Sequence, residues 1–463
     1  MIELNRAQPP LPNAKSEFNL PKFEEKFLQN GSRVIFHQKL GLPITTITFI
    51  VEAGSKYDPA GGEGLAQLTA ALLDEGAGEF DSLALSALLE SKGLTLRVFA
   101  NNDYFEVNIS GLSENIDLML KIVSDVVYDP HFRMEDFERE RDKIRNRIQQ
   151  MKNQPEAMAW ELLDKIIQGR PNCYTFTSAN EESIEEITLS DVTFFHAEQI
   201  EPLKPVFTVV TDLPYNQVET AIHKHFLGKM GAHEPEKPDT GFALKDLRFF
   251  ILDRKGAPQT EILGGFPTES LRSSREDEAF KLVNNLYGGH FNSRLMRNLR
   301  EEKGYTYGVG SFLISMKDSS KFIISASVDT VNTGNALLEI LKEMNDVRKN
   351  ISDEELEFSR SQRVRGIPFM FETYDMISSL LRTIVELQLP LDYFENSRQE
   401  LTRVTMEDAI SAANHYLKLE NLQFVLVGDR EGILKTIPQP LLRGVVEIND
   451  RGKVIRRDAG GNL

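Results

Sequence analysis

The chain has 463 residues, which is long enough for more than one domain and excludes a peptide or a single small module. Its 53 basic and 70 acidic residues give a formal net charge of −17, which argues against nucleic acid or an anionic membrane surface as a partner. The single cysteine, Cys173, excludes an intramolecular disulfide and a thiolate metal cage within one chain.

The first residues, Met1 to Arg6, show no basic patch followed by an apolar stretch, so no secretory signal is predicted. Apolar runs such as residues 47–51 have the size of strands and are far shorter than the roughly 18 residues that suggest a membrane span. We therefore expect a cytoplasmic protein with neither a membrane nor a nucleic-acid partner.

The first half of the chain predicts strands alternating with amphipathic helices. An apolar strand at 47–51 is followed by an alternating strand at 105–109. Residues 116–123 then show the i, i+3, i+4 apolar spacing of a helix with one buried face. A short helix, a turn and an apolar strand at 206–210 end this half.

The same order returns in the second half of the chain. Strands are predicted at 261–266 and 322–328, a helix with one apolar face at 337–344, and a final strand at 424–427. The matched positions are separated by 215 to 218 residues. This near-constant offset, on elements of the same type, predicts that the chain is an internal duplication.

We therefore predict two homologous domains, at residues 1–230 and 242–463, joined by a polar, proline-bearing linker at 231–241. Strands follow one another closely and helices come in runs. This order favours an α+β fold over a doubly wound parallel sheet, with helices covering one face of a mostly antiparallel sheet in each domain.

Residues 64–76 read Gly-Leu-Ala-Gln-Leu-Thr-Ala-Ala-Leu-Leu-Asp-Glu-Gly, and this frame resembles the zinc helix of the insulinase/pitrilysin metallopeptidases, the inverzincins. In that family the helix contains His-x-x-Glu-His: two histidines on one face bind zinc, and the glutamate is the base for the bound water. A second glutamate follows about 76 residues later. The resemblance covers essentially the whole chain and implies that its two domains form half of a clamshell.

The metal ligands of that motif are all replaced here. The corresponding positions are Gln67, Ala70, Ala71 and, for the distant glutamate, Arg147. Alanine offers no lone pair, glutamine is a poor zinc ligand, and a guanidinium repels a divalent cation. We expect no zinc and no other cofactor in this chain.

The second half keeps a different part of the family pattern. The segment from Leu286 to Val309 resembles the family's second substrate-binding element, in which an arginine ends a helix and a tyrosine begins a strand seven residues later. These positions are Arg300 and Tyr307, and Gly304 between them is expected to cap the helix in the left-handed conformation. The pattern also allows a purely structural interpretation, with a dipole-compensating arginine and a packed strand tyrosine.

Other candidate sites are weaker. His223 and His225 do not share a helical face, so a solvated or packed pair is favoured over a metal site. His196 lies in an apolar and aromatic helix, which favours a hydrogen-bonded core histidine. The sequence contains no phosphate-binding glycine loop and no signature of a serine or cysteine hydrolase.

In two-chain members of the family, one subunit carries the zinc helix and the other supplies the Arg/Tyr pair across a closed chamber. The resemblance thus implies the non-zinc subunit of a heterodimeric zinc peptidase that encloses peptide substrates. Its partner is expected to be a homologous chain with an intact His-x-x-Glu-His and its own zinc, and a homodimer is possible without that partner. The alternative is a non-enzymatic peptide-binding or structural scaffold of the same fold.

Overall fold

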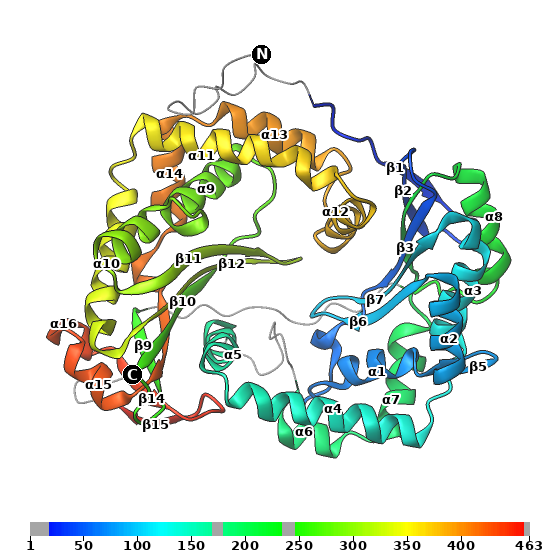
Figure 1. The fold of residues 1–463 in the computed structure, drawn as a ribbon, viewed down its shortest axis with the longest axis horizontal. Coiled ribbons are helices and arrows are strands. Elements are labelled where there is room, and N and C mark those ends of the chain that lie inside the picture. The colour runs from blue at the N-terminus through cyan, green and yellow to red at the C-terminus, as the bar shows by residue number, and fades with distance from the viewer. Residues whose placement is uncertain (1–17, 169–178, 234–245, 458–463) are drawn as a thin grey trace, which may run out of the picture.

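The computed structural model describes residues 18–168, 179–233 and 246–457. Two β-sheets lie on opposite sides of the molecule, each with its own layer of helices (Figure 1). We call the parts of the chain around them the N-terminal and C-terminal halves. Cys173 and most of the predicted linker at 231–241 lie outside the described residues.

The N-terminal half contains a six-stranded sheet in the order β1-β2-β8-β3-β7-β6. All neighbouring strands in it are antiparallel except β2 and β8. A two-stranded ribbon, β4–β5, lies beside it. The strands are β1 (Glu24–Phe27), β2 (Arg33–Gln38), β3 (Ile44–Val51), β4 (Gly76–Ala77), β5 (Phe80–Asp81), β6 (Thr95–Ala100), β7 (Phe105–Leu112) and β8 (Val206–Thr211).

The C-terminal half contains a seven-stranded sheet in the order β11-β12-β10-β13-β9-β14-β15, in which β9 runs parallel to both β13 and β14. Both sheets are thus mostly antiparallel, and the predicted α+β class is confirmed. The strands are β9 (Arg248–Asp253), β10 (Gln259–Thr268), β11 (Thr306–Ser315), β12 (Ser320–Asp329), β13 (Gln423–Gly428), β14 (Val445–Ile448) and β15 (Val454–Arg457).

Helices make up most of the remaining described chain. In the N-terminal half they are α1 (Leu65–Leu73), α2 (Ser82–Lys92), α3 (Ile116–Tyr128), α4 (Met134–Lys152), α5 (Pro155–Gln168), α6 (Glu181–Glu186), α7 (Leu189–Phe195) and α8 (Tyr215–Phe226). In the C-terminal half they are α9 (Arg275–Asn284), the π-helical segments η4 (Asn285–Gly289) and η5 (Met296–Glu302), α10 (Thr333–Val347), α11 (Asp353–Gly366), α12 (Tyr374–Glu386), α13 (Tyr393–Arg403), α14 (Met406–Tyr416), α15 (Arg430–Thr436) and α16 (Gln439–Leu442).

The two halves repeat one topology. The strand order β2-β8-β3-β7-β6 returns as β9-β13-β10-β12-β11. Helices α7 and α14 occupy equivalent places and begin with the same capping box, Thr188 with Asp191 and Thr405 with Asp408. The duplication seen as a sequence offset is therefore present in the structure down to the helix caps.

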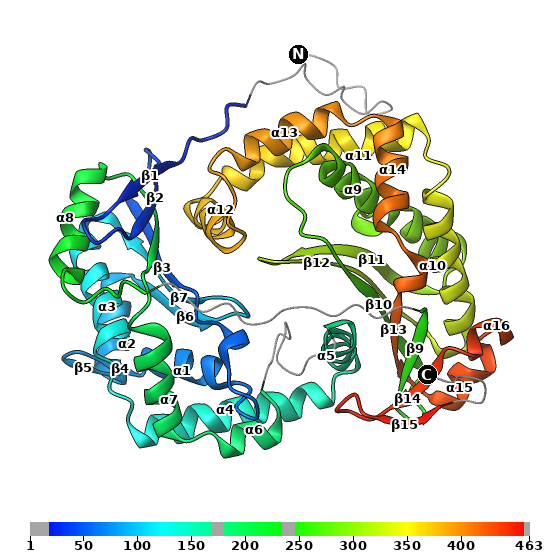
Figure 2. The ribbon, with the colours of Figure 1, turned by 180° about the vertical axis from the view of Figure 1, so that it is seen from behind.

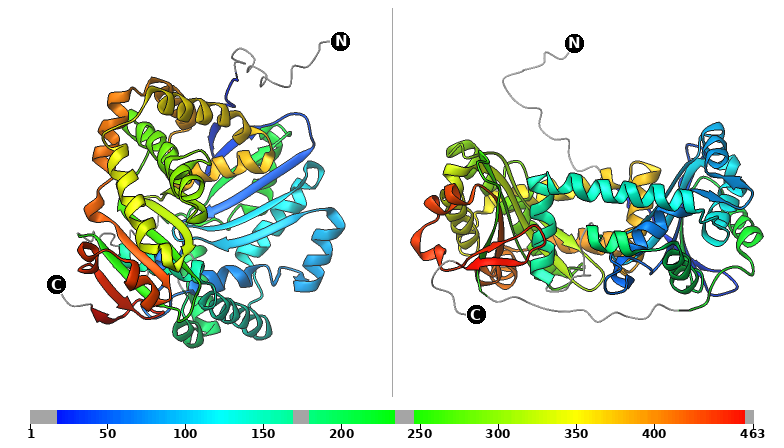
Figure 3. Two further views of the ribbon diagram at one scale, coloured as in Figure 1. Left: turned by 60° about the vertical axis from the view of Figure 1, so that its left-hand side comes forward. Right: turned by 90° about the horizontal axis from the view of Figure 1, so that it is seen from below.

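Each sheet also takes a helix from the opposite half on its second face (Figures 1 and 2). Helix α5 belongs to the N-terminal half by sequence, but its Leu162 and Leu163 pack in the cluster of the C-terminal sheet. Helix α12 does the reverse, and its Ile377 and Leu381 pack in a cluster of the N-terminal sheet. Viewed from below, α4 runs from the side of the N-terminal sheet toward α5 and the other half (Figure 3).

Each exchanged helix brings a charged residue to a buried partner on its host sheet. On α5, Asp164 pairs with Lys321 of β12 at 2.7 Å, with both side chains at most 5% exposed. On α12, Arg382 pairs with Glu106 of β7 at 3.3 Å. Lys321 and Glu106 are the second residues of equivalent strands, so the two ion pairs occupy matching places with their charges reversed.

The Asp164–Lys321 pair gives a stability prediction. The substitution Lys321→Met leaves the carboxylate of Asp164 buried without its cation, and we expect it to lower the free energy of unfolding by about 3–5 kcal/mol. Adding Asp164→Leu removes the stranded charge and should recover most of this loss. Denaturant titration measures both. Lys342→Met, which removes a cation from an exposed ion pair, is the control and should leave the midpoint unchanged.

Candidate functional site

Helix α1 has the sequence frame of a zinc helix, and side-chain hydrogen bonds and a glycine fix its first turn. Asp58 is buried and its carboxylate accepts hydrogen bonds from the amides of Gly64 (2.7 Å) and Ala66 (2.8 Å). Gly64 has φ +100°, and a Cβ there would meet the Cβ of Ala179 at 2.6 Å. The chain thus keeps the entry into this helix, which only glycine permits at position 64.

The side chains on α1 do not suit a metal. Gln67 and Ala71 lie one turn apart and are partly exposed, while Ala70 is buried. Arg147 lies on α4, which packs against α1; its side chain is exposed and forms no ion pair with any described residue. One amide, two methyl groups and a guanidinium offer zinc no usable ligand set, so the donors present do not fit the metal of the resembling family.

Helices α1 and α4 run antiparallel, which places Arg147 at the level of Gln67. Glu75, just after the end of α1, pairs with Arg139 in the first part of α4 at 2.5 Å. Near the other end of α4, Lys152 pairs with Glu181 at 2.7 Å, next to the segment that contacts the start of α1. The frame around the four replaced positions is therefore intact.

A cavity of about 430 Å³ lies between the two halves beside Gln67. Its walls come from α1, from the β6–β7 turn at Asn101–Tyr104, from the β11–β12 hairpin at Ile314–Lys317, and from the ends of α5 and α12. The lining is largely apolar, with Phe99, Ile314 and Met316 among its residues. The replaced zinc position thus borders a cavity that both halves line.

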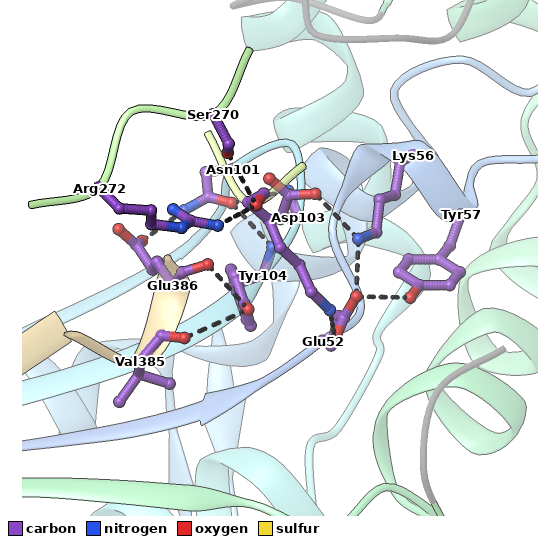
Figure 4. A network of polar contacts seen from close by, with 11 residues as sticks. Glu52, Lys56, Tyr57, Asn101, Asp103, Tyr104, Ser270, Arg272, Val385 and Glu386 are labelled. Atoms are coloured by element: carbon purple, nitrogen blue, oxygen red, sulfur yellow. Dashed lines mark hydrogen bonds and ion pairs between the residues drawn. The ribbon is translucent and has the colours of Figure 1, made fainter. Parts of the chain in front are cut away.

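A polar network closes this junction (Figure 4). Lys317, from the tip of the β11–β12 hairpin, donates to Glu52 at 2.6 Å, and Lys56 joins Glu52 (2.7 Å) to Asp103 (2.9 Å). On the same side, the side-chain amide of Asn101 donates to the carboxylate of Glu386 on α12 at 2.8 Å. Lys317 is only 6% exposed, so the hairpin is anchored in the N-terminal half by a buried cation.

Arg300 and Tyr307 flank a tight reversal of the chain. Arg300 lies in the last turn of η5, and the amide of Tyr305 donates to the carbonyl of Leu299 at 2.8 Å. Gly304 has φ +66°, as the expected left-handed cap requires. Strand β11 then opens with a register shift between Thr306 and Val309, which leaves Tyr307 in a bulge. Bulges re-aim side chains, and they occur often beside active sites.

Neither side chain of this pair has a hydrogen-bond or ion-pair partner among the described residues. Tyr307 is 92% exposed, which rules out the packed strand tyrosine of the structural interpretation. The guanidinium of Arg300 lies 4.8 Å from the ring centre of Phe291 and makes no hydrogen bond or ion pair with a described residue. Both groups are therefore available to a ligand.

The pair is remote from the chain's own α1. Tyr307 stands at the start of β11, whereas the hairpin that reaches the cavity beside Gln67 follows the end of that strand at Ser315. Nine residues of extended chain separate Tyr307 from Met316, which corresponds to about 30 Å. The side chains that the family pattern places around one metal thus lie far apart within this molecule.

A second cavity, also of about 430 Å³, adjoins η5. His290, Arg297, Glu301 and Phe358 are among its lining residues. Beside it, Arg294 donates to both carboxylate oxygens of Glu355 at 2.7 and 2.8 Å. Although burial acts in the opposite direction, the bonds from Arg294 and Ser352 lower the pKa of Glu355 to about 2. This pair braces η5 against α11.

The weaker histidine candidates behave as structural residues. His196 is buried, and its Nε2 lies 2.7 Å from the carbonyl oxygen of Val127, as expected for a core histidine. His225 lies beside Asp117 at 3.0 Å, and Lys224 shares that carboxylate. Among residues 18–168, 179–233 and 246–457, no cluster of three or more His, Cys, Asp or Glu could hold a metal ion.

Sequence reasoning missed the residues that join the halves. Glu52, Asp164, Lys317 and Lys321 gave no signal, because single charged residues are usually solvated. Lys321 falls in the phase of β12 opposite to the apolar Phe322 and Ile324, so the alternation predicts a solvated position, whereas α5 covers that face in the structure. A charged residue there needs a buried partner, although the pattern does not say which one.

Comparisons with known proteins agree with this geometry. The model of the insulinase family, peptidase family M16, matches residues 33–171, and that of the peptidase M16 inactive domain matches residues 186–363. The chain belongs to peptidase family M16. Among solved structures, an M16 inactive domain from Pseudomonas fluorescens shares the fold with a TM-score of 0.81 and 24% identity, covering 88% of this chain and 98% of that one.

Curated relatives of this M16 chain include proteins named as peptidases and one named as a non-peptidase. The non-peptidase homolog YmxG of Helicobacter pylori is 23% identical over 86% of this chain and 92% of its own length. An uncharacterised zinc protease of Mycobacterium leprae is 22% identical over 89% and 93%. Subunit 1 of the bovine mitochondrial cytochrome b-c1 complex is 22% identical over 48% and 46%. No helix within the described ranges has the length and apolarity needed to cross a bilayer.

Asp58 gives a prediction of pH dependence. Burial raises the pKa of Asp58 to about 7, against the effect of its amide donors. Between pH 4 and 7 the unfolded carboxyl has lost its proton and the folded one has kept it, so stability falls as the pH rises. The free-energy difference between the wild type and Asp58→Asn should decline across this range by up to about 1.4 kcal/mol per pH unit. Unfolding at several pH values measures it, and a flat difference would contradict the assignment.

The intact frame around Gln67 predicts that metal binding can be restored. The triple substitution Gln67→His, Ala71→His, Arg147→Glu supplies two histidines on one helical face and a carboxylate from α4, the donor set of a His₂Glu zinc site. We expect this variant to retain about one zinc per chain after dialysis, by elemental analysis, while the wild type retains none. Gln67→His alone is the control, since one histidine does not hold zinc.

Proposed function

We propose that this chain is the catalytically incomplete subunit of a two-chain zinc peptidase. In this role it contributes Arg300 and Tyr307 to a homologous partner that carries an intact zinc helix. The observation that carries the proposal is the state of these two side chains: Tyr307 is 92% exposed in a bulge, and Arg300 has no acidic partner among the described residues. Groups without a structural role at a braced turn fit a binding function.

The two side chains supply complementary chemistry. The guanidinium of Arg300 is a planar fork of N–H donors that suits a peptide carbonyl or carboxylate. The hydroxyl of Tyr307 can donate to the oxygen that gains negative charge when a peptide carbonyl is attacked. The attacking water and its metal would belong to the partner, because positions 67, 70, 71 and 147 offer no ligand set here.

The separation within the chain supports a partner. Tyr307 lies at the opposite end of β11 from the hairpin that lines the cavity beside Gln67, so the pair suits a substrate held by a second chain across a chamber better than one held at α1. The match to an inactive-domain model and the existence of both zinc-protease and non-peptidase relatives fit a division of labour between homologous subunits. Substrates would be peptides or small unfolded proteins, and a homodimer is possible without the partner.

A scaffold role is the second candidate. It is favoured by the similarity of about half the chain to a subunit of the bovine cytochrome b-c1 complex and by the fixed junction between the halves. The two candidates differ in one observation. A neighbouring gene that encodes a chain of similar length with an intact His-x-x-Glu-His supports the peptidase, and its absence together with stable incorporation into another complex supports the scaffold.

The peptidase proposal is tested by reconstitution with the zinc-bearing partner. We expect Arg300→Ala to lower kcat/KM for a peptide substrate by about 100-fold or more, because a donor to the reacting carbonyl is lost. Tyr307→Phe, which removes only the hydroxyl, should act mainly on kcat. Arg403→Ala, which removes an exposed arginine from α13, is the control and should have no effect. An unchanged kcat/KM for Arg300→Ala in a complex that still assembles would refute the role.

A further inference from the structure

A third cavity, of about 350 Å³, lies between the edge strand β11 and helices α9 and α11. Most of its wall is polar, and the polar lining residues are Lys281, Asn284, Asn285, Ser311, Ser315 and Arg363. It adjoins the cavity beside Gln67 at Ser315, but neither Gln67 nor Arg300 nor Tyr307 lines it, so the proposed function does not account for it.

Two cations in this wall share a single carboxylate. Lys281 donates to Glu278 Oε1 at 2.7 Å, to the hydroxyl of Tyr393 at 3.1 Å and to the carbonyl of Arg272 at 2.7 Å. Arg363 approaches the other oxygen of Glu278 only to 3.9 Å. Because Lys281 already neutralises Glu278, the charge of Arg363 is left without a matched anion.

The guanidinium of Arg363 is also short of hydrogen bonds. Its Nε is buried without an acceptor, and its other nitrogens make no hydrogen bond to a described residue. Buried donors left unpaired are costly, and native structures rarely leave them so.

Two cations, Lys281 and Arg363, therefore line this space and share a single carboxylate, Glu278, in a chain whose formal net charge is −17. A local excess of positive charge with unfilled N–H donors is the environment that a carboxylate occupies best, since a guanidinium binds it through two parallel hydrogen bonds. The volume leaves room for the carboxylate together with a small side chain.

We propose that this cavity is a carboxylate-binding site, in which Arg363 holds the anion and Lys281 supplies positive potential. The ligand class rests on the proposed function: in a peptide chamber the carboxylate is that of a peptide, either at its C-terminus or on an acidic side chain. The site then anchors one end of a peptide on the C-terminal half.

Equilibrium binding to the isolated full-length chain tests the site without any partner. The probes are N-acetyl-trialanine, its C-terminal amide, and the amide of N-acetyl-Ala-Ala-Asp, titrated by saturation-transfer NMR. We expect the free acid to bind at least tenfold more tightly than its amide. If the aspartyl amide binds like the free acid, the site takes any carboxylate; if it binds like the neutral amide, the site takes the C-terminus.

Variants assign the effect to the cavity. Arg363→Gln should abolish the preference for the acid, whereas Arg365→Gln, which alters an exposed arginine on the same helix, should keep it. Ser315→Asp keeps Arg363 but places a carboxylate in the wall, and it should also abolish the preference. Equal binding of acid and amide by the wild type, or an unchanged preference in a folded Arg363→Gln variant, would overturn the proposal.

This outcome is independent of the catalytic role proposed above. Arg300→Ala should keep the preference for the acid, because Arg300 does not line the cavity. A chain that binds the acid but gives no activity with any partner would refute the peptidase and leave the carboxylate site standing. A reconstituted complex that cleaves peptides but binds the acid and the amide equally would refute the carboxylate site and leave the peptidase standing.

Discussion

The exchange of helices between the halves is the constraint on which the rest of the structure depends. Each sheet is completed by a helix that the opposite half supplies, and each exchanged helix brings one charged residue to a buried counter-ion, Asp164 to Lys321 and Arg382 to Glu106. A buried charge is costly without its counter-ion. The two ion pairs therefore fix how the halves are placed relative to one another. That arrangement builds the cavity beside Gln67 and sets the distance from it to Tyr307.

The chain has kept the architecture of a metallopeptidase helix after losing its chemistry. Asp58 and Gly64 still hold the first turn of α1, since that helix packs in the core whether or not a metal is bound. The Arg300–Tyr307 element shows the opposite relation, because Tyr307 is exposed and Arg300 has only the ring of Phe291 beside it, with no ion pair among the described residues. Packing accounts for the first feature, and the binding role that we propose would account for the second.

The sequence was informative where local rules decide the structure. The offset between the halves, the left-handed cap at Gly304 and the core position of His196 follow from periodicity, glycine chemistry and apolar context. The exchange of α5 and α12 could not be predicted. The apolar face of an amphipathic helix indicates that the helix packs against another element, but it does not indicate which sheet that is. The bulge at Tyr307 and the unmatched charge of Arg363 depend on strand register and on tertiary neighbours, which no spacing encodes.

Because α5 and α12 each pack on the sheet of the opposite half, the chain cannot be cut between the halves without affecting both sheets. A fragment cut between the halves would carry away a helix that its former neighbour needs, and each piece would present a bare apolar sheet face with an orphaned charge, Lys321 on one and Glu106 on the other. The two copies of the ancestral unit are thus no longer autonomous folding modules. Complementation by co-expressed fragments should succeed where either fragment alone aggregates.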